Sequence, residues 1–273
     1  MEEKKILFTD IDGTLINDKK EVPKENMEAI KKALAAGHYV VIATGRPLVS
    51  GIMIAEKTEL NMPGCYLIAY NGAVVYDFGK NKMIEEKTLS YDLVLELFRR
   101  AEQAGIYIQT YYKEQVVARC KTEELEAYCK HAKMDYLISD DIMEVLKEEP
   151  KKAMLIDFKE KEKLRRFRSE NMDWQEGKCN SFFSTDSYLE YAPLGATKAT
   201  GIHYLCEFLN IPLENTIAAG DERKDIPMIQ EAHIGVAMQN AKAEIKEVAD
   251  YVTKRTNNEG GIAEIIEKFM LQD

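Results

Sequence analysis

The sequence has no apolar run that approaches a membrane-spanning helix, which needs about 20 consecutive apolar residues. Residues 1–5, Met-Glu-Glu-Lys-Lys, lack the apolar segment of a signal peptide and lead directly into a strand-like run. We therefore expect a cytoplasmic protein that does not have a membrane as its partner.

Cysteine is scarce, odd in number and scattered. No two cysteines have the short paired spacing of a zinc site, and nothing suggests a disulfide frame. We therefore expect reduced thiols, as in a cytoplasmic protein. The five cysteines are Cys65, Cys120, Cys129, Cys179 and Cys206.

Positive charge is in deficit, with 37 basic against 47 acidic side chains and a formal net charge of −10. This balance argues against nucleic acid or an anionic membrane as the main partner. An anionic substrate would need a local positive site, because the overall field of the protein opposes its approach.

Internal repeats, low-complexity tracts and Gly/Ser-rich linkers are also absent, yet 273 residues are enough for two domains. Short continuous apolar runs alternate with stretches of helical spacing in the first and last thirds. This rhythm predicts a doubly wound parallel sheet, an α/β fold of the Rossmann-like kind. The runs cover residues 6–8, 39–43, 66–69, 216–219 and 234–238.

The middle third has a different pattern, in which apolar residues alternate with polar and aromatic ones, as in residues 107–111 and 115–118. Such alternation is typical of an antiparallel sheet with one covered face. We predict an α+β domain over residues 86–190, inserted into a core made of residues 1–85 and 191–273.

Within the core, a helix is expected after Pro23, with Met27, Ile30, Leu34 and Ala35 as its apolar positions. The doubly wound pattern is expected to return at Pro193. Helices are then predicted over residues 198–209, 226–231, 241–248 and 262–269, with a short strand at 251–252.

The first strand runs directly into two acidic residues, Asp10 and Asp12, followed by Gly13. In extended backbone the two side chains project to the same side. Carboxylates this close repel each other, so the fold needs a compensating charge. Mg²⁺ suits hard oxygen ligands and usually takes one or two protein carboxylates together with phosphate. For Asp-x-Asp alone, an acidic turn at a strand end is the alternative.

Further polar groups follow predicted strands or begin a predicted helix, where parallel sheets bind ligands. Each has a simpler interpretation: Thr44 as a helix cap, Lys198 as one exposed lysine, and Asp221 and Asp225 as partners of a helix dipole. Their joint occurrence in this order favours a single site.

At this point the sequence resembles the haloacid dehalogenase-like hydrolase superfamily, and within it the Cof-type phosphatase group. The resemblance covers the whole chain and implies the fold of that superfamily with an inserted α+β cap domain. It rests on five motifs: Asp10-Ile11-Asp12-Gly13-Thr14-Leu15, Thr44-Gly45-Arg46-Pro47, Asn71-Gly72-Ala73, Gly195-Ala196-Thr197-Lys198 and Gly220-Asp221-Glu222-Arg223-Lys224-Asp225.

The resemblance implies a phosphatase in which Asp10 attacks phosphorus and forms an aspartyl-phosphate. Asp12 would protonate the leaving group and then accept a proton from water. Mg²⁺ would be held by Asp10, Asp221 and the backbone carbonyl of Asp12, with Asp225 acting through water or through another ligand.

The phosphate would be held by Thr44 and by the backbone N–H groups of Ile11 and Gly45, while Lys198 offsets the charge of nucleophile and phosphate. Arg46 could reach a second anionic group, with structural pairing as the alternative. The cap would exclude water and contact the leaving group. The implied partner is a small phosphorylated metabolite such as a sugar phosphate, and the protein would be a monomer or weak homodimer.

Two positions depart from the family pattern. Lys224 stands where the family usually has an Asn that helps to hold the phosphate, and Gln239 stands where a Gly is common. A lysine can donate to phosphate as a point charge on a longer stem, or it can pair with Asp225 or Glu222. We expect reduced or altered turnover rather than its loss.

Three rival functions share some of these residues. A phosphomutase would use the same carboxylates and return the phosphate to a sugar. A receiver-type phospho-acceptor module also carries acids, Thr and Lys at strand ends, but it is less than half this length. A weakly active homologue could act only by binding a phosphometabolite.

Overall fold

The computed structural model describes residues 3–272, which divide into two compact units. The first contains the chain up to Arg46, Gly51–Glu85 and the chain from Thr197 onward. The second contains Pro47–Ser50 and Glu86–Ala196. The second unit is therefore inserted into the first, mostly as Glu86–Ala196.

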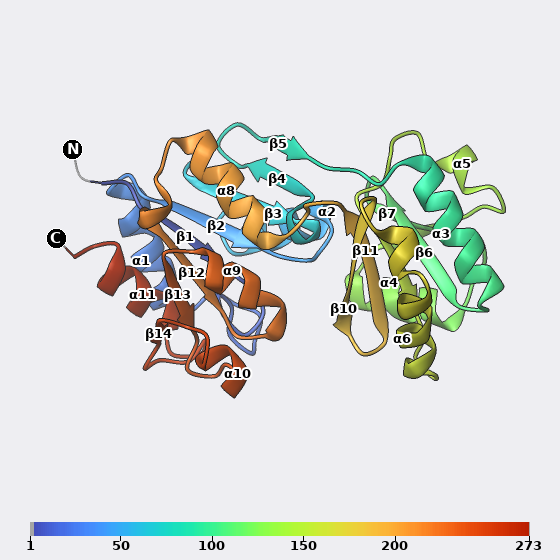
Figure 1. Ribbon diagram of the computed structural model, residues 1–273. Helices are drawn as coiled ribbons and strands as arrows, with labels where there is room; N and C mark the ends of the chain where they lie inside the picture. Colours follow the sequence, from blue (N-terminus) through green and yellow to red (C-terminus); the bar gives the residue numbers. More distant parts are fainter. Residues whose placement is uncertain (1–2, 273) are drawn as a thin grey trace. The chain divides into compact units, whose positions relative to one another are not determined.

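The first unit is built on an eight-stranded sheet in the order β14-β13-β12-β1-β2-β3-β4-β5 (Figure 1). The pairs from β14 to β3 are parallel, and β3 pairs with β4 in antiparallel fashion. The strands are β1 (Ile6–Thr9), β2 (Tyr39–Ala43), β3 (Cys65–Ala69), β4 (Val74–Asp77), β5 (Lys82–Glu86), β12 (Thr216–Gly220), β13 (Ile234–Ala237) and β14 (Tyr251–Val252).

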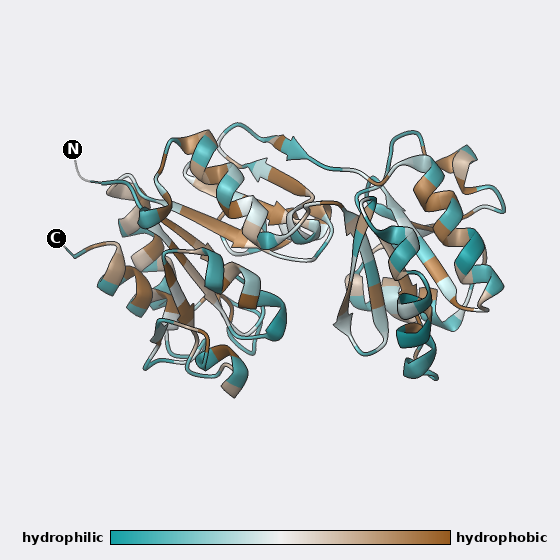
Figure 2. Ribbon diagram, viewed as in Figure 1, coloured by the Kyte–Doolittle hydropathy of each residue, from teal (hydrophilic) through white to brown (hydrophobic). Residues whose placement is uncertain are grey.

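Helices lie on both faces of this sheet, which is why its central strands are apolar throughout (Figure 2). Phe8 of β1 lies in one apolar cluster with Ile202 and Met228 on one face. Leu67 alternates to the other face, where it packs against Gly51. The helices are α1 (Lys24–Ala35), α2 (Leu48–Lys57), α8 (Lys198–Leu209), α9 (Ile226–Glu231), α10 (Ala243–Lys246) and α11 (Gly261–Phe269), with short 3₁₀ turns η1 (Tyr70–Gly72), η2 (Leu213–Asn215) and η3 (Arg223–Asp225).

The strand register brings three loops together at the carboxyl edge of the sheet. Thr9 at the end of β1 is paired with Ile42 of β2 and with Ala219 of β12. The segments that follow these residues therefore begin side by side, although they are far apart in the sequence. They carry Asp10, Thr44 and Asp221, respectively.

The second unit contains a six-stranded sheet in the order β10-β11-β9-β6-β7-β8. Neighbouring strands in this sheet are antiparallel, except that β7 and β8 are parallel. Its elements are α3 (Tyr91–Gln103), β6 (Tyr107–Tyr112), β7 (Gln115–Ala118), α4 (Glu123–Ala132), β8 (Asp135–Ile138), α5 (Ile142–Val145), β9 (Ala153–Ile156), α6 (Lys161–Glu170), α7 (Met172–Gln175), β10 (Cys179–Thr185) and β11 (Tyr188–Pro193).

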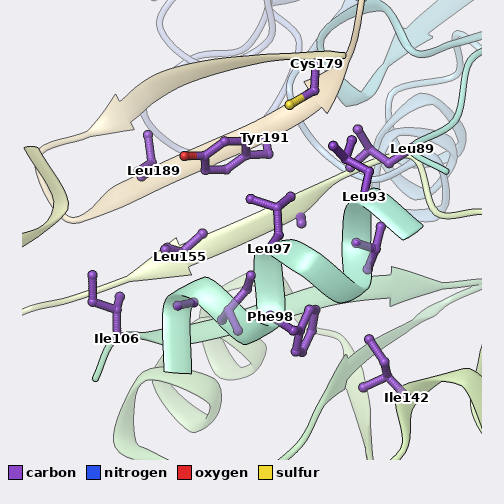
Figure 3. Close-up of a cluster of buried hydrophobic side chains, with 14 of the residues drawn as sticks. Leu89, Leu93, Leu97, Phe98, Ile106, Ile142, Leu155, Cys179, Leu189 and Tyr191 are labelled. Carbon is purple, nitrogen blue, oxygen red and sulfur yellow. The ribbon is translucent and has the colours of Figure 1, made fainter. Parts of the chain in front are cut away.

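One face of this second sheet packs against α3 through a continuous apolar core, shown in Figure 3. Leu97 and Phe98 of α3 are fully buried there, together with Leu155 of β9 and Tyr191 of β11. Ser90 caps α3 by accepting a hydrogen bond from the Leu93 N–H, which fixes where the helix begins. The second unit thus has a hydrophobic core of its own.

The predicted fold class, a doubly wound α/β sheet with an inserted α+β domain, is confirmed. Several details differ from expectation. The buried positions of α1 include Asn26 and Ala33, whereas Ala35 is exposed. Asn26 is buried because its side chain donates to the Leu15 carbonyl and accepts from Ala263 N–H. Pro193 ends β11 of the second sheet instead of starting the core again. Within the described residues, none of the helices combines the length and the apolarity that a membrane crossing requires.

Candidate active site

Asp10 lies at the end of β1 with 1% of its surface exposed. Both of its carboxylate oxygens are close to an ammonium group. Nζ of Lys198 lies 2.6 Å from Oδ1, and Nζ of Lys224 lies 3.2 Å from Oδ2. A buried carboxylate is costly without such compensation, so the two ammonium groups offset the charge of Asp10.

Lys198 is the first residue of α8 and is 3% exposed. The preceding Thr197 caps the helix and forms a capping box with Thr200, which fixes the first turn. Burial lowers the pKa of Lys198, but the carboxylates of Asp10 and Asp225 raise it by more, so the amine stays protonated. One ammonium group therefore joins two acids that lie 215 positions apart (10 and 225) in the sequence.

Asp225 is fully buried, and both of its carboxylate oxygens accept hydrogen bonds. Oδ1 accepts from Lys198 at 2.7 Å, and Oδ2 accepts from the backbone N–H groups of Asp221 and Glu222 at 3.3 and 3.1 Å. Asp225 thereby folds the loop after β12 and holds Lys198 in place. Of the two interpretations from sequence, a purely helix-dipole role does not account for these contacts.

Asp221, Asp10 and Asp225 form a carboxylate cluster in which one oxygen of each lies within 4.8 Å of the others. Thr14 donates to Oδ1 of Asp221 at 2.8 Å. Burial, followed by the nearby Asp10 and Asp225, raises the pKa of Asp221 to about 7 even though the Thr14 hydrogen bond lowers it. A carboxyl whose pKa is raised by burial and by neighbouring acids is one that a hard divalent cation would stabilise in its ionised form. These residues therefore match the expected Mg²⁺.

Gly13 makes the approach of Asp221 possible. Its φ is +77°, and a β-carbon at this position would lie 2.2 Å from Oδ2 of Asp221. Any other residue would be strained and would also displace the carboxylate. The side chain of Asn240 further fixes the turn by donating to the Gly13 carbonyl at 2.7 Å.

Asp12 is held by two cations, one on each oxygen. Lys20 donates to Oδ1 and Arg46 to Oδ2, both at 2.7 Å. Burial would raise the pKa of Asp12, but the hydrogen bonds and charges of Lys20 and Arg46 lower it to about 2. Asp12 is therefore an ionised carboxylate here, and Arg46 makes a structural ion pair, one of the two roles considered for it.

The loop after β2 contains Thr44, Gly45 and Arg46. Thr44 is 4% exposed, its backbone N–H donates to the Ile68 carbonyl at 2.8 Å, and its hydroxyl accepts from Arg46 N–H at 3.2 Å. The Ile11 carbonyl accepts from Leu15 and Ile16 N–H, both at 3.1 Å, which closes the turn after β1. Both turns sit at the carboxyl edge of the sheet, as expected.

The structure brings together Asp10, Asp221, Asp225, Lys198 and Lys224. Asp12, Ile11, Thr44, Gly45 and Arg46 lie in the turns after β1 and β2 at the same edge of the sheet. Lys20, Thr14 and Asn240 were not anticipated. Thr14 lies inside the first motif, so its hydroxyl could have been considered, whereas Lys20 and Asn240 carry no signal in the sequence. Gln239 has an exposed side chain and donates its backbone N–H to Thr253 at 2.8 Å.

Similar proteins are known over almost the whole chain. A family model described as haloacid dehalogenase-like hydrolase matches residues 7–266. A Bacillus subtilis protein named 5-amino-6-(5-phospho-D-ribitylamino)uracil phosphatase is 34% identical over 98% of this chain and 96% of its own.

Solved structures show the same likeness. A haloacid dehalogenase-like hydrolase from Bacteroides thetaiotaomicron is 31% identical with a TM-score of 0.86, covering 97% of this chain and 99% of its own. A subclass IIB sugar phosphatase of the superfamily is 25% identical with a TM-score of 0.79 and covers 97% and 99%. The chain belongs to the haloacid dehalogenase-like hydrolase family, in its Cof-type phosphatase group.

Proposed function

We propose that this phosphatase hydrolyses small phosphomonoesters in a Mg²⁺-dependent reaction that passes through a phosphorylated Asp10. The observation that carries the proposal is the buried Asp10 carboxylate, held between Lys198 at 2.6 Å and the acids Asp221 and Asp225. A structural role alone would not need three acids gathered at the edge of the sheet where such folds bind ligands.

In the first step an oxygen of Asp10 attacks phosphorus, and the bond between phosphorus and the ester oxygen breaks. The leaving alkoxide takes a proton from Asp12, which must first be released from Lys20 and Arg46 and take up a proton from solvent, because between these two cations it is ionised. Lys198 and Lys224 offset the charge of the carboxylate and the phosphate, which otherwise repel each other. Thr44 and the N–H groups of Ile11 and Gly45 orient the phosphate oxygens.

In the second step water attacks phosphorus of the aspartyl-phosphate, and the bond to the Asp10 oxygen breaks. The ionised Asp12 accepts the proton of that water, and inorganic phosphate leaves. The ion pairs of Asp12 with Lys20 and Arg46 suit this basic role. For the first step Asp12 must exchange these partners for the leaving group.

When bound, Mg²⁺ supplies charge neutralisation for the incoming phosphate and the attacking carboxylate. Asp10, Asp221 and the backbone carbonyl of Asp12 would hold it, and Asp225 would keep the loop of Asp221 in place. The raised pKa of Asp221, about 7, supports a cation at this position.

We further propose that residues 86–190, within the second unit, act as a cap that selects the leaving group. The preferred substrate class is a sugar phosphate or a comparable small phosphomonoester. A sugar phosphatase among the structural relatives and the phosphoribitylaminouracil phosphatase among the sequence relatives support this size of substrate.

The test is a screen of purified protein with Mg²⁺ against phosphorylated sugars and the phosphoribitylaminouracil substrate, with release of inorganic phosphate as the readout. Asp10→Asn should abolish release, and Glu28→Gln, at an exposed acid of α1, should leave it unchanged. Phosphate returned to a sugar, with need for a bisphosphate activator, would identify a phosphomutase and contradict the proposal.

A further inference from the structure

The turn after β3 has an unusual backbone at three consecutive residues. Tyr70, Asn71 and Gly72 have φ values of 49°, 57° and 109°, all in the left-handed region. This region costs roughly 1–2 kcal/mol for most residues, although Asn tolerates it better than Tyr. A turn that keeps this conformation must be held by its surroundings.

On one side the turn holds the loop of Thr44. The backbone N–H of Asn71 donates to the Thr44 carbonyl at 3.0 Å, and that of Tyr70 donates to the Arg46 carbonyl at 2.9 Å. The Asn71 amide lies directly against Gly45, where a β-carbon would be 2.7 Å from Oδ1. Three contacts therefore fix the backbone of residues 44–46, the loop proposed to hold the phosphate (hereafter the phosphate loop).

On the other side the turn touches the start of α8. A β-carbon at Gly72 would lie 2.1 Å from the carbonyl oxygen of Thr197 and 2.8 Å from its nitrogen. Thr197 is the N-cap of α8, and the next residue is Lys198. The two backbones can lie this close only because residue 72 has no side chain.

We propose that the Tyr70–Gly72 turn is a positioning element that fixes the phosphate loop and Lys198 relative to each other. Asn71 is the positioning residue for Gly45, and Gly72 sets the place of Thr197 and hence of Lys198. The inference rests on the proposed function and adds to it, because it assigns Asn71 and Gly72 to hold Gly45 and Thr197 in place. The sequence contained the Asn71-Gly72 motif, but nothing in it assigned a role.

The two contacts predict different kinetic effects. Loss of the Asn71 amide loosens the loop that holds phosphate oxygens, so binding should weaken. A side chain at position 72 moves Lys198 away from Asp10, so the chemical step should slow. A misplacement of about 1 Å can cost about 100-fold in rate.

The first test compares Asn71→Gly with Asn81→Gly. Asn81 also has a left-handed φ, 51°, but it bonds Tyr76 in the β4–β5 hairpin. Glycine adopts a left-handed backbone without strain, so neither substitution should lower Tm by straining its turn. Asn71→Gly should raise KM and the Kd for inorganic phosphate about 10-fold at unchanged Tm, whereas Asn81→Gly should change neither.

The second test is Gly72→Ala, which should lower kcat 10-fold or more with little change in KM. Wild-type KM and phosphate Kd in Asn71→Gly would overturn the inference. Equal losses of Tm and activity in both asparagine variants would also overturn it, because the role would then be structural. Phosphate binding followed by ³¹P NMR or calorimetry needs no turnover. A wild type that binds phosphate but hydrolyses no ester would contradict the proposed function, while Asn71→Gly would still test the turn.

Discussion

Nζ of Lys224 lies 3.2 Å from Oδ2 of Asp10, on the opposite oxygen from Lys198. From sequence, Lys224 was expected to meet phosphate or to pair with Asp225 or Glu222. Glu222 is instead paired with Lys242 at 2.6 Å. Lys224 therefore brings a full positive charge to the nucleophile, where the resemblance leads us to expect an uncharged amide.

Lys224→Asn should strengthen the apparent affinity for Mg²⁺ and change turnover. The ammonium of Lys224 neutralises an oxygen of Asp10 and repels a divalent cation placed beside it. Removing one charge a few ångströms away should lower the Mg²⁺ concentration at half-activity by about 10-fold. Calorimetric titration with Mg²⁺ and steady-state kinetics measure both effects. Lys242→Asn is the control, and identical kinetics and Mg²⁺ binding in wild type and Lys224→Asn would discard the idea.

Lys198→Met should damage both stability and activity. The ammonium joins two carboxylates that are at most 2% exposed, and its loss leaves both without that partner. Removing one member of a buried ion pair costs about 3–5 kcal/mol. Urea unfolding measures this loss, and phosphate release should fall at least 100-fold, by about the amount seen when one charge-stabilising donor is lost. A variant with wild-type stability would show that the buried acids do not depend on Lys198.

Mg²⁺ should raise the thermal stability of the protein, because it relieves the repulsion among the three clustered acids. At 100 times Kd, a ligand that binds only the folded state adds about 2.7 kcal/mol. Thermal unfolding with Mg²⁺ or with EDTA measures the shift, and activity should be lost in EDTA and return with Mg²⁺. The shift should disappear in Asp221→Asn but persist in Asp140→Asn. Equal Tm values with Mg²⁺ and EDTA would count against a metal site.

Gly13→Ala should remove Mg²⁺ binding with only a modest loss of stability. The new methyl group would overlap Oδ2 of Asp221, which lies 2.2 Å from its position. The strained φ costs about 1–2 kcal/mol on its own. The Mg²⁺-induced rise in Tm is the direct readout. If Gly13→Ala kept that rise, the close approach of Asp221 would not be needed for the metal.

The site acids and Lys198 could be located from sequence because each follows a buried strand or begins a strongly patterned helix. The topology of a parallel sheet then brings their loops to one edge, as for Asp10 and Asp221. The partners of Asp12 could not be predicted, since Lys20 lies in a polar loop whose path depends on contacts such as Asn17 with Glu21. Asn26 was missed for a related reason: a polar residue is buried there because its amide links two distant segments.

The second unit offers a prediction that does not depend on catalysis. Lys152 and Glu190 form an ion pair at 3.0 Å with 3% and 5% of their side chains exposed, and the Lys152 ammonium also lies over the ring of Tyr111. Lys152→Met should cost about 3–5 kcal/mol in urea unfolding, because the carboxylate of Glu190 stays buried without that ammonium. Replacing both residues, as Lys152→Met with Glu190→Leu, should restore most of the loss, since two apolar side chains do not leave a buried charge. The contrary outcome is a double variant whose loss in free energy of unfolding equals the sum of the losses of Lys152→Met and Glu190→Leu. The two residues would then not be energetically coupled, and their contact would contribute nothing to the stability of this unit.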